Sequence, residues 1–193
     1  AHIASSFFHS GFERAMCLTM DAFGDRLSAA LVLADKEKGL KVLETRPFSN
    51  SLGVFYATMT NFLGFKNMDD FKVMGLAPYG KPNIDLSFFC KPTSDGYFSD
   101  PSYFRSNKDA SHLEAYYSEK LIQKIGQPRR INQKLNTFYL DVAASTQSTL
   151  EACAISLVKY LYKITNQTKL CISGGVGLNC SMNKKISELD FIE

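Results

Sequence analysis

AMCLTMDAFGDRLSAALVLA, residues 15–34, consists of two apolar runs on either side of a polar turn. The runs, residues 15–21 and 27–34, are typical of strands, and Gly24 permits a tight reversal between them. A third run, residues 40–45, follows a charged turn. The first quarter of the chain is therefore predicted to be a three-stranded antiparallel meander.

Helices are predicted to dominate the remainder. Apolar residues recur at a spacing near 3.6 over residues 51–63 and 138–164, and the second of these helices is expected to be mostly buried. Residues 110–125 also look helical, and a short helix capped by Asp69 is expected to stop at Pro78 and Gly80. The region between residues 81 and 106 has no clear period and is expected to be irregular or short-stranded.

Near the C-terminal end, residues 169–173 resemble a short strand, residues 174–177 form a glycine-rich turn, and helical character resumes at Leu178. The predicted fold class is mixed α/β, with a hairpin-rich mixed sheet flanked by helices.

Composition narrows the class of protein. The chain has 193 residues, 45% of them hydrophobic, and its net charge of +3 comes from 22 basic and 19 acidic side chains scattered along the sequence. That length suits one domain or part of a larger one. Because no long basic block exists, we expect no nucleic-acid partner, and the basic run at residues 124–134 is better explained as a solvated loop.

The five cysteines are widely spaced and contain no Cys-x-x-Cys pair, so we expect buried apolar thiols in a reducing compartment. No run of 18 apolar residues and no leader pattern is present, which favours a cytoplasmic protein without a membrane partner. The chain opens on Ala1-His2 without a Met, and we expect it to be cut from something longer.

A first candidate site lies at the end of the first predicted strand. Asp21 is followed by Gly24 and Asp25, and a carboxylate beside a glycine turn can hold a divalent cation while turn amides face phosphate oxygens. Asp and Gly are also ordinary turn formers, so a purely structural turn remains the alternative.

A second candidate is the run of residues 173–179, Ser-Gly-Gly-Val-Gly-Leu-Asn. Glycines allow the backbone to approach a nucleotide closely, and the helix start that follows offers unpaired amides. The run lacks both the Gly-Lys-Ser/Thr ending of a P-loop and the dinucleotide-binding glycine spacing. A structural strand-to-helix turn is the alternative interpretation.

Two single side chains are further candidates. His2 could ligate a metal or carry protons, although a lone histidine is more often structural or solvated. Lys72 precedes a Pro/Gly turn, where its ammonium could meet a phosphate, although a surface lysine on an amphipathic helix is the simpler explanation. His9 and His112 have no ligand-like neighbours.

Seven blocks of the sequence occur together in a recognisable order: residues 2–8, 11–15, 18–21, 51–53, 71–80, 143–147 and 174–180. In this order they resemble the carbamoyltransferase family that includes nodulation protein U and the cephalosporin and tobramycin carbamoyltransferases. The resemblance implies that residues 1–193 are part of an actin-like ATPase (ribonuclease H-like) domain, similar to the universal tRNA-threonylcarbamoylation protein. It also implies that a C-terminal carbamoyladenylate-forming domain is absent from this chain and would be its partner.

The family binds iron(II) through a His-x-x-x-His pair and two aspartates. By this resemblance His2 corresponds to the second histidine and Asp21 to one aspartate, with iron(II) or another divalent metal as cofactor. The remaining histidine would precede Ala1 and the remaining aspartate would follow Glu193. The nucleotide loop would comprise Gly174, Gly175, Val176, Gly177 and Asn179, whereas Gly24 and Lys72 are weaker phosphate or substrate candidates.

The chemistry implied has two stages. Carbamoyl phosphate and ATP give carbamoyladenylate, and the carbamoyl group then passes to a hydroxyl of a sugar or another small molecule. We expect the 193-residue piece alone to be inactive. A relative acting in tRNA threonylcarbamoylation or hydrogenase maturation, and a non-catalytic nucleotide-binding domain, are the alternatives; pairing of two copies as a homodimer is left open.

Overall fold

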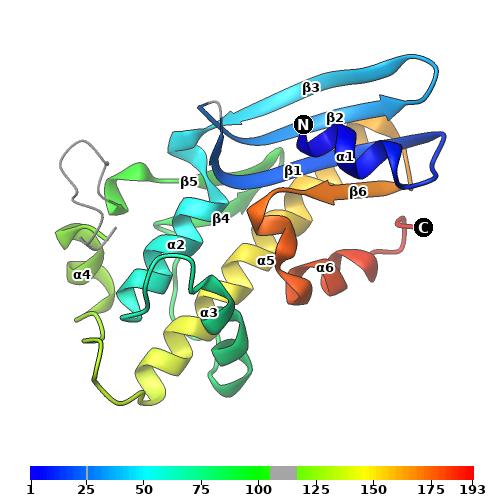
Figure 1. Ribbon diagram of the computed structural model, residues 1–193. Coiled ribbons are helices and arrows are strands. Elements are labelled where there is room, and N and C mark those ends of the chain that lie inside the picture. The colour runs from blue at the N-terminus through cyan, green and yellow to red at the C-terminus, as the bar shows by residue number, and fades with distance from the viewer. Residues whose placement is uncertain (25, 105–116) are drawn as a thin grey trace.

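Four strands form one mixed sheet in the part of the chain that the computed structural model describes, residues 1–24, 26–104 and 117–193. They are β1 (Arg14–Gly24), β2 (Leu27–Asp35), β3 (Gly39–Pro47) and β6 (Leu170–Ser173). Their order across the sheet is β3-β2-β1-β6, with β3 at one edge and β6 at the other (Figure 1). The predicted meander and the late strand are both confirmed.

Register fixes which strand ends meet. β1 pairs antiparallel with β2, with Cys17 opposite Val32, and parallel with β6, with Cys17 opposite Cys171. Because parallel strands run in the same direction, the carboxyl ends of β1 and β6 lie at the same edge of the sheet. The β1–β2 pairing shifts register between Met20 and Gly24, so β1 departs from regular pairing just where Asp21 is placed.

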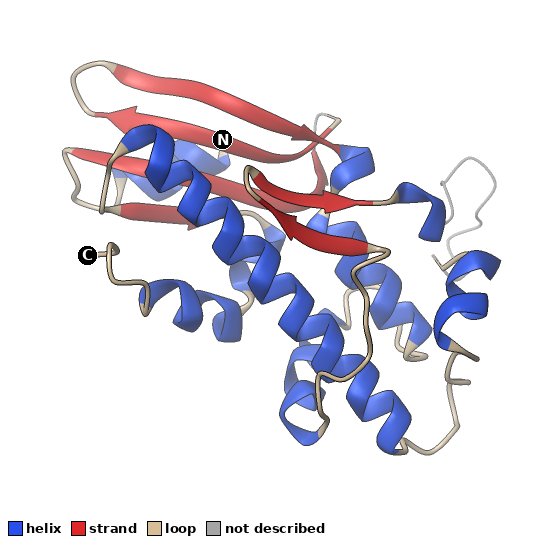
Figure 2. Cartoon of the chain, turned by 180° about the vertical axis from the view of Figure 1, so that it is seen from behind, coloured by secondary structure: helices blue, strands red, loops and turns tan. Residues whose placement is uncertain are grey.

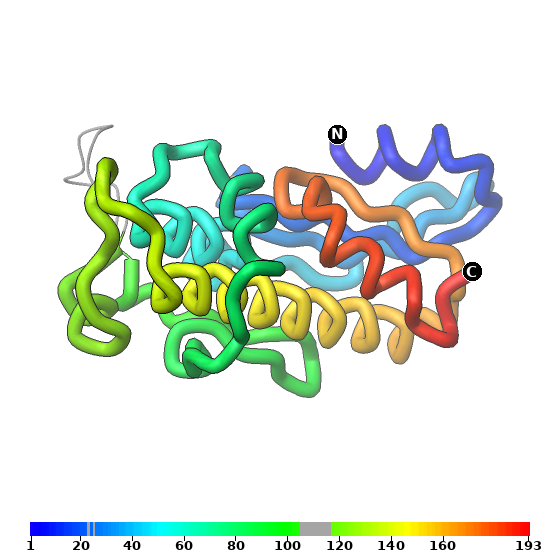
Figure 3. The backbone as a smooth tube through the Cα atoms, turned by 90° about the horizontal axis from the view of Figure 1, so that it is seen from below, coloured from blue at the N-terminus to red at the C-terminus, as the bar shows by residue number. Residues whose placement is uncertain are grey.

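The sheet is covered on both faces, and strand alternation assigns each side chain to one of them. α1 (His2–Phe8) packs its Ile3 and Phe7 against the face that carries Cys17. Met16 and Leu18 point the other way, into the main core beneath α2 (Leu52–Phe62) and α5 (Thr137–Thr165). Figure 3 shows these layers, with α1 and α5 on opposite sides of the sheet.

α5 is the central support of the second layer (Figure 2). Asn136 caps its start by accepting the Tyr139 backbone N–H at 3.1 Å, and Asn166 ends it in a left-handed conformation with φ of 51°. Residues 142–147 are all buried, so this part of the helix is enclosed on every side. The predicted long helix is confirmed.

Most of the other elements pack against α5. The other elements are α3 (Asp70–Leu76), the hairpin of β4 (Cys90–Thr93) and β5 (Gly96–Ser99), α4 (Glu119–Ile125) and α6 (Cys180–Ser187). The expectation of short strands after residue 81 is confirmed. For the helix predicted over residues 110–125, positions 110–116 lie outside the described residues. Asp69 precedes α3 but makes no capping bond to it, because its carboxylate accepts from Lys66 N and Lys72 Nζ instead.

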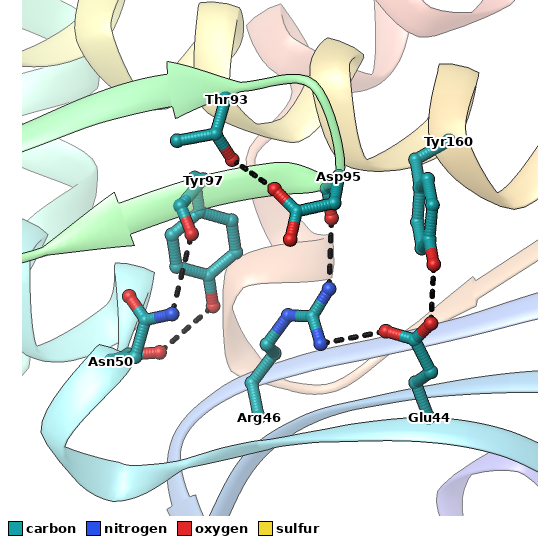
Figure 4. Close-up of polar contacts among 7 residues, drawn as sticks. All are labelled: Glu44, Arg46, Asn50, Thr93, Asp95, Tyr97 and Tyr160. Carbon is teal, nitrogen blue, oxygen red and sulfur yellow. Dashed lines mark hydrogen bonds and ion pairs between the residues drawn. The ribbon is translucent and has the colours of Figure 1, made fainter.

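A group of polar contacts ties the β4–β5 hairpin to the sheet and to α5 (Figure 4). Arg46 on β3 donates to the Glu44 carboxylate and to the Asp95 carbonyl, each at 2.8 Å. The Tyr160 hydroxyl of α5 also donates to Glu44. These two donors, Tyr160 first, hold the pKa of Glu44 below its ordinary value.

We predict that Tyr160→Phe lowers the free energy of unfolding by roughly 1 kcal/mol at pH 7. A carboxyl whose pKa is lowered on folding stabilises the folded state at pH values above its unfolded pKa. The stabilisation from the Tyr160–Glu44 bond should therefore vanish as the pH falls through the folded pKa of Glu44. Urea denaturation at pH 7 and pH 3 measures it. Tyr162→Phe is the control, since the Tyr162 ring stacks on Phe191. Equal losses for Tyr160→Phe at both pH values would refute the assignment to Glu44.

Candidate functional site

The candidate site lies where β6 ends, beside the last residues of β1. The chain leaves β6 through Gly174, which has φ of +89°, and enters a 3-10 turn at Gly175–Leu178. A Cβ on Gly174 would lie 2.2 Å from the Met20 carbonyl oxygen, so only glycine allows this turn to pass so close to β1. The carboxyl ends of neighbouring strands are the usual place for ligands in open α/β sheets.

Packing within the chain explains part of the glycine content of this loop. A Cβ on Gly177 would lie 3.0 Å from the Ile172 side chain, and Gly174 is constrained as described above. Gly175 differs, because a Cβ there would lie 3.1 Å from Asp21 Oδ1. Glycine at this position therefore keeps the space beside the Asp21 carboxylate clear.

Asp21 and His2 come together from separate elements. The Asp21 Oδ1 atom accepts its neighbour's Ala22 N–H at 2.9 Å, which orients the carboxylate. Its Oδ2 atom lies 3.3 Å from His2 Nε2, at the start of α1. The structure thus brings together the two side chains that the sequence singled out as metal ligands, one from β1 and one from α1.

These two side chains match part of a metal donor set. A neutral imidazole nitrogen and a carboxylate oxygen are ligands that iron(II), manganese and zinc accept. Their separation is compatible with two ligands of one ion. Within the described residues, no group of three or more His, Cys, Asp or Glu side chains gathers to hold a metal, so His2 and Asp21 would supply only part of a coordination shell.

The start of α2 is fastened to the same strand end. Ser51 Oγ donates to the carbonyls of Asp21 and Ala22, at 3.0 and 2.7 Å, and accepts the Val54 N–H at 3.1 Å. A Cβ on Gly53 would lie 2.5 Å from Ala22 N. The Ser-Leu-Gly block is thereby explained: Ser51 caps the helix and Gly53 permits its close approach to β1.

A cavity of about 430 Å³ opens beside this strand end. Asp21, Gly53, Gly175 and Asn179 lie on its wall, together with many apolar side chains from α2, α3 and the glycine loop. Met68, Phe71 and Leu178 line it while remaining largely exposed. The volume falls within the range of small-molecule pockets. Its polar side chains come from two sides, Asp21 and Asn179 at the glycine loop and Tyr56, Asn67 and Asp70 from α2, the connection that follows it and the start of α3.

Two weaker candidates lie elsewhere. Gly24 is exposed and pairs with Leu27 across the hairpin, and Asp25 lies outside the described residues. Lys72 Nζ contacts the Asp69 carboxylate at 2.8 Å and lies 5.8 Å from the centre of the Phe71 ring. Neither Gly24 nor Lys72 is among the described residues that line the cavity, so the structure gives no support to a ligand role for either.

Sequence reasoning missed three side chains that support the loop. Tyr56, Gln147 and Glu151 are buried beneath Asn179 and linked to it by hydrogen bonds. They occupy positions on α2 and α5 that a helical period assigns to the core, where polar groups are uncommon. A buried Gln and Glu one turn apart was the available signal, since such groups persist only when they are paired.

None of the described helices is long and apolar enough to cross a membrane.

Comparison with known proteins identifies a family whose sequences this chain matches. The family model described as "Carbamoyltransferase N-terminus" matches residues 1–191. Nodulation protein NolO of Bradyrhizobium diazoefficiens is 33% identical over 189 residues, which cover 96% of this chain and 32% of that protein. Nodulation protein NolNO of Sinorhizobium fredii is 32% identical over 189 residues, covering 96% and 26%. An uncharacterised Synechocystis protein is 32% identical over 192 residues, covering 96% and 30%. The chain therefore spans between about a quarter and a third of the length of these relatives.

Proposed function

This chain belongs to the carbamoyltransferase family, whose N-terminal model it matches over residues 1–191, and from that premise we propose that it forms part of an O-carbamoyl-transfer site. The donor would be carbamoyladenylate, made from carbamoyl phosphate and ATP by another part of the complete protein. The acceptor would be a hydroxyl of a sugar or another small molecule. One observation carries the proposal: the Asp21 carboxylate faces Gly175 of the glycine loop, on the wall of a cavity large enough for a small molecule.

In this proposal the glycine loop positions the adenylate. Gly175 and Gly177 carry no side chains, and the loop follows a strand whose end opens into the cavity. Backbone amides of such a loop can approach phosphate oxygens closely. Gly175, Val176 and Asn179, which line the cavity, would therefore contact the AMP moiety, and Gly174 and Gly177, which do not line it, would shape the loop.

His2 and Asp21 would hold a divalent metal, iron(II) by family resemblance. The metal would supply Lewis-acid polarisation and neutralise negative charge near the phosphate. Asp21 is pre-oriented for this role by the Ala22 N–H that it accepts, and Ser51 fixes the same strand end from α2. The protein would thus hold the Asp21 carboxylate in a fixed position at this edge of the sheet.

The transfer exchanges one bond of the carbamoyl carbon for another. The acceptor oxygen forms a bond to this carbon, the bond from the carbon to the phosphate oxygen breaks, and AMP leaves with the electron pair. The acceptor proton passes to a base or to water. Donors directed at the developing negative charge would lower the barrier.

Isotope transfer tests the proposal. The complete protein that carries this chain should move label from [13C]carbamoyl phosphate, with ATP, into an O-carbamate on a member of a panel of sugars and other alcohols, as followed by 13C NMR. In a parallel mixture of ATP, threonine, tRNA and [13C]bicarbonate, label appearing on threonylcarbamoyladenosine, with no O-carbamate formed in the first mixture, would favour the tRNA-modifying relative. Nucleotide binding without any labelled product would favour a non-catalytic domain, and either result would overturn O-carbamoyl transfer.

A further inference from the structure

Beneath the glycine loop lies a buried network of four side chains from two helices and the loop. Gln147 and Glu151 lie one turn apart on α5, and each is only 5% exposed. Tyr56 reaches the network from α2, and Asn179 joins it from the end of the loop. Outside it, Lys185 on α6 pairs with Glu151 at 2.5 Å. The proposed reaction assigns no role to the α2 and α5 members.

The orientation of each amide in this network is determined by a partner with only one hydrogen-bonding role. Asn179 Oδ1 accepts the Met182 backbone N–H at 2.9 Å, which only an oxygen can do. Gln147 Nε2 donates to Glu151 Oε1 at 2.8 Å, and a carboxylate paired with Lys185 acts as an acceptor. Neither amide can therefore be turned over without losing a bond.

With both orientations fixed, the two amides pair face to face. Gln147 Nε2 donates to Asn179 Oδ1 at 2.9 Å, and Asn179 Nδ2 donates back to Gln147 Oε1 at 3.0 Å. The Tyr56 hydroxyl donates to the same Gln147 oxygen at 2.8 Å. Both N–H groups and both acceptor positions of Gln147 are thereby used, as are both acceptor positions of Asn179.

One donor is left over from this pairing. Asn179 Nδ2 has a second N–H that the pair with Gln147 does not use, and Asn179 lines the cavity together with Tyr56. This N–H belongs to a side chain that the network holds at the wall of the cavity.

We infer that Gln147 is a positioning residue, which fixes the Asn179 amide so that its second N–H meets an oxygen of the bound ligand. The ligand class rests on the proposed function: a phosphate oxygen of AMP or of the adenylate. A side-chain donor already held in place does not have to be ordered when the ligand binds, which favours affinity. Without Gln147 only the Met182 N–H would hold the Asn179 amide, through Oδ1, and Nδ2 would lose the acceptor that orients it.

The positioning is tested first in the ligand-free chain by 1H–15N NMR of the Asn179 side-chain NH2 group. One of its two protons should exchange slowly with water and the other quickly. In Gln147→Met, which keeps the side-chain length, both should exchange quickly. Fast exchange of both protons in the wild-type chain would overturn the inference without any variant, as would unchanged protection in Gln147→Met.

The ligand contact is tested by titrating AMP and following its affinity. Gln147→Met should weaken AMP binding about tenfold, equivalent to one good hydrogen bond. In an Asn179→Ala background the same substitution should change affinity less than about twofold, because Gln147 acts through Asn179. Gln123→Met, on the exposed side of α4, is the matched control.

The outcomes separate the two proposals. Equal effects of Gln147→Met in both backgrounds would show that Gln147 acts only on stability, and would overturn the inference. If the wild-type chain shows the expected Asn179 exchange pattern but does not bind AMP, Gln147 still positions Asn179. That result would count against the nucleotide site. If Gln147→Met leaves the affinity for AMP unchanged, the proposed function stands and the inference about Gln147 is overturned.

Discussion

Replacing Asp21 with asparagine should reduce carbamoyl transfer by the complete protein at least about 100-fold and remove its bound metal. Asparagine keeps the shape of the side chain and can still accept the Ala22 N–H that orients it. What it loses is the negative charge that faces His2 at 3.3 Å. The fold should therefore survive, because the main core lies below the sheet and does not include this side chain.

Metal content by inductively coupled plasma mass spectrometry and isotope transfer from [13C]carbamoyl phosphate measure this effect. Asp85→Asn is the matched control: Asp85 is exposed, accepts the Ser87 N–H, and is not among the described residues of the cavity wall. Wild-type metal content and turnover in Asp21→Asn would remove Asp21 from the site.

Replacing Gly174 with alanine should destabilise the fold more than alanine at Gly175 or Gly177 of the same loop. The added Cβ would meet the Met20 carbonyl oxygen at 2.2 Å, and the backbone has φ of +89°. Because the clash is with backbone of β1, relief requires β1 and β6 to separate. We expect a loss of roughly 2–4 kcal/mol in the free energy of unfolding, together with loss of AMP binding.

Gly39→Ala separates the steric clash from the cost of the left-handed backbone conformation. Gly39 has a similar φ of +81° but no atom within 4 Å of the position of a Cβ. It should therefore show only the left-handed backbone penalty, about 1 kcal/mol. Urea denaturation of both variants measures the difference. Equal small losses would mean that the loop can move away from β1, and that its geometry is not fixed as described.

Much of the fold was predictable because it follows from local patterns. Two apolar runs around Gly24 predicted the hairpin, and a long apolar period predicted α5. Asp69 was predicted to cap α3 but does not. The helix start and the Lys72 ammonium compete for its carboxylate, and capping propensity alone does not say which of the two lies within reach.

The site was predictable only in part, since it depends on contacts between distant segments. Asp21 and Gly175 are 154 positions apart and meet only because β6 pairs parallel to β1. His2 and Asp21 could be chosen from the family resemblance, and the structure places them in contact. Gln147 could not be assigned a role, because a polar residue on a buried helix face acquires one only when its partners are known.

Lys72 and Gly24 were chosen from residue type and local sequence alone. Both have the chemistry that suits a phosphate, yet side-chain type does not determine direction. Lys72 turns toward Asp69, and Gly24 lies at the exposed end of the hairpin. A ligand role for either remains a prediction without geometric support.

The central claim is that the ends of β1 and β6 form one site for nucleotide and metal. Crystals of the complete protein with AMP and iron(II), recorded at the iron absorption edge, test it most directly. We predict an anomalous peak within coordination distance of the Asp21 carboxylate and the His2 imidazole, with the AMP phosphate against residues 174–179. An iron peak and AMP bound together elsewhere, with this edge of the sheet empty, would contradict it.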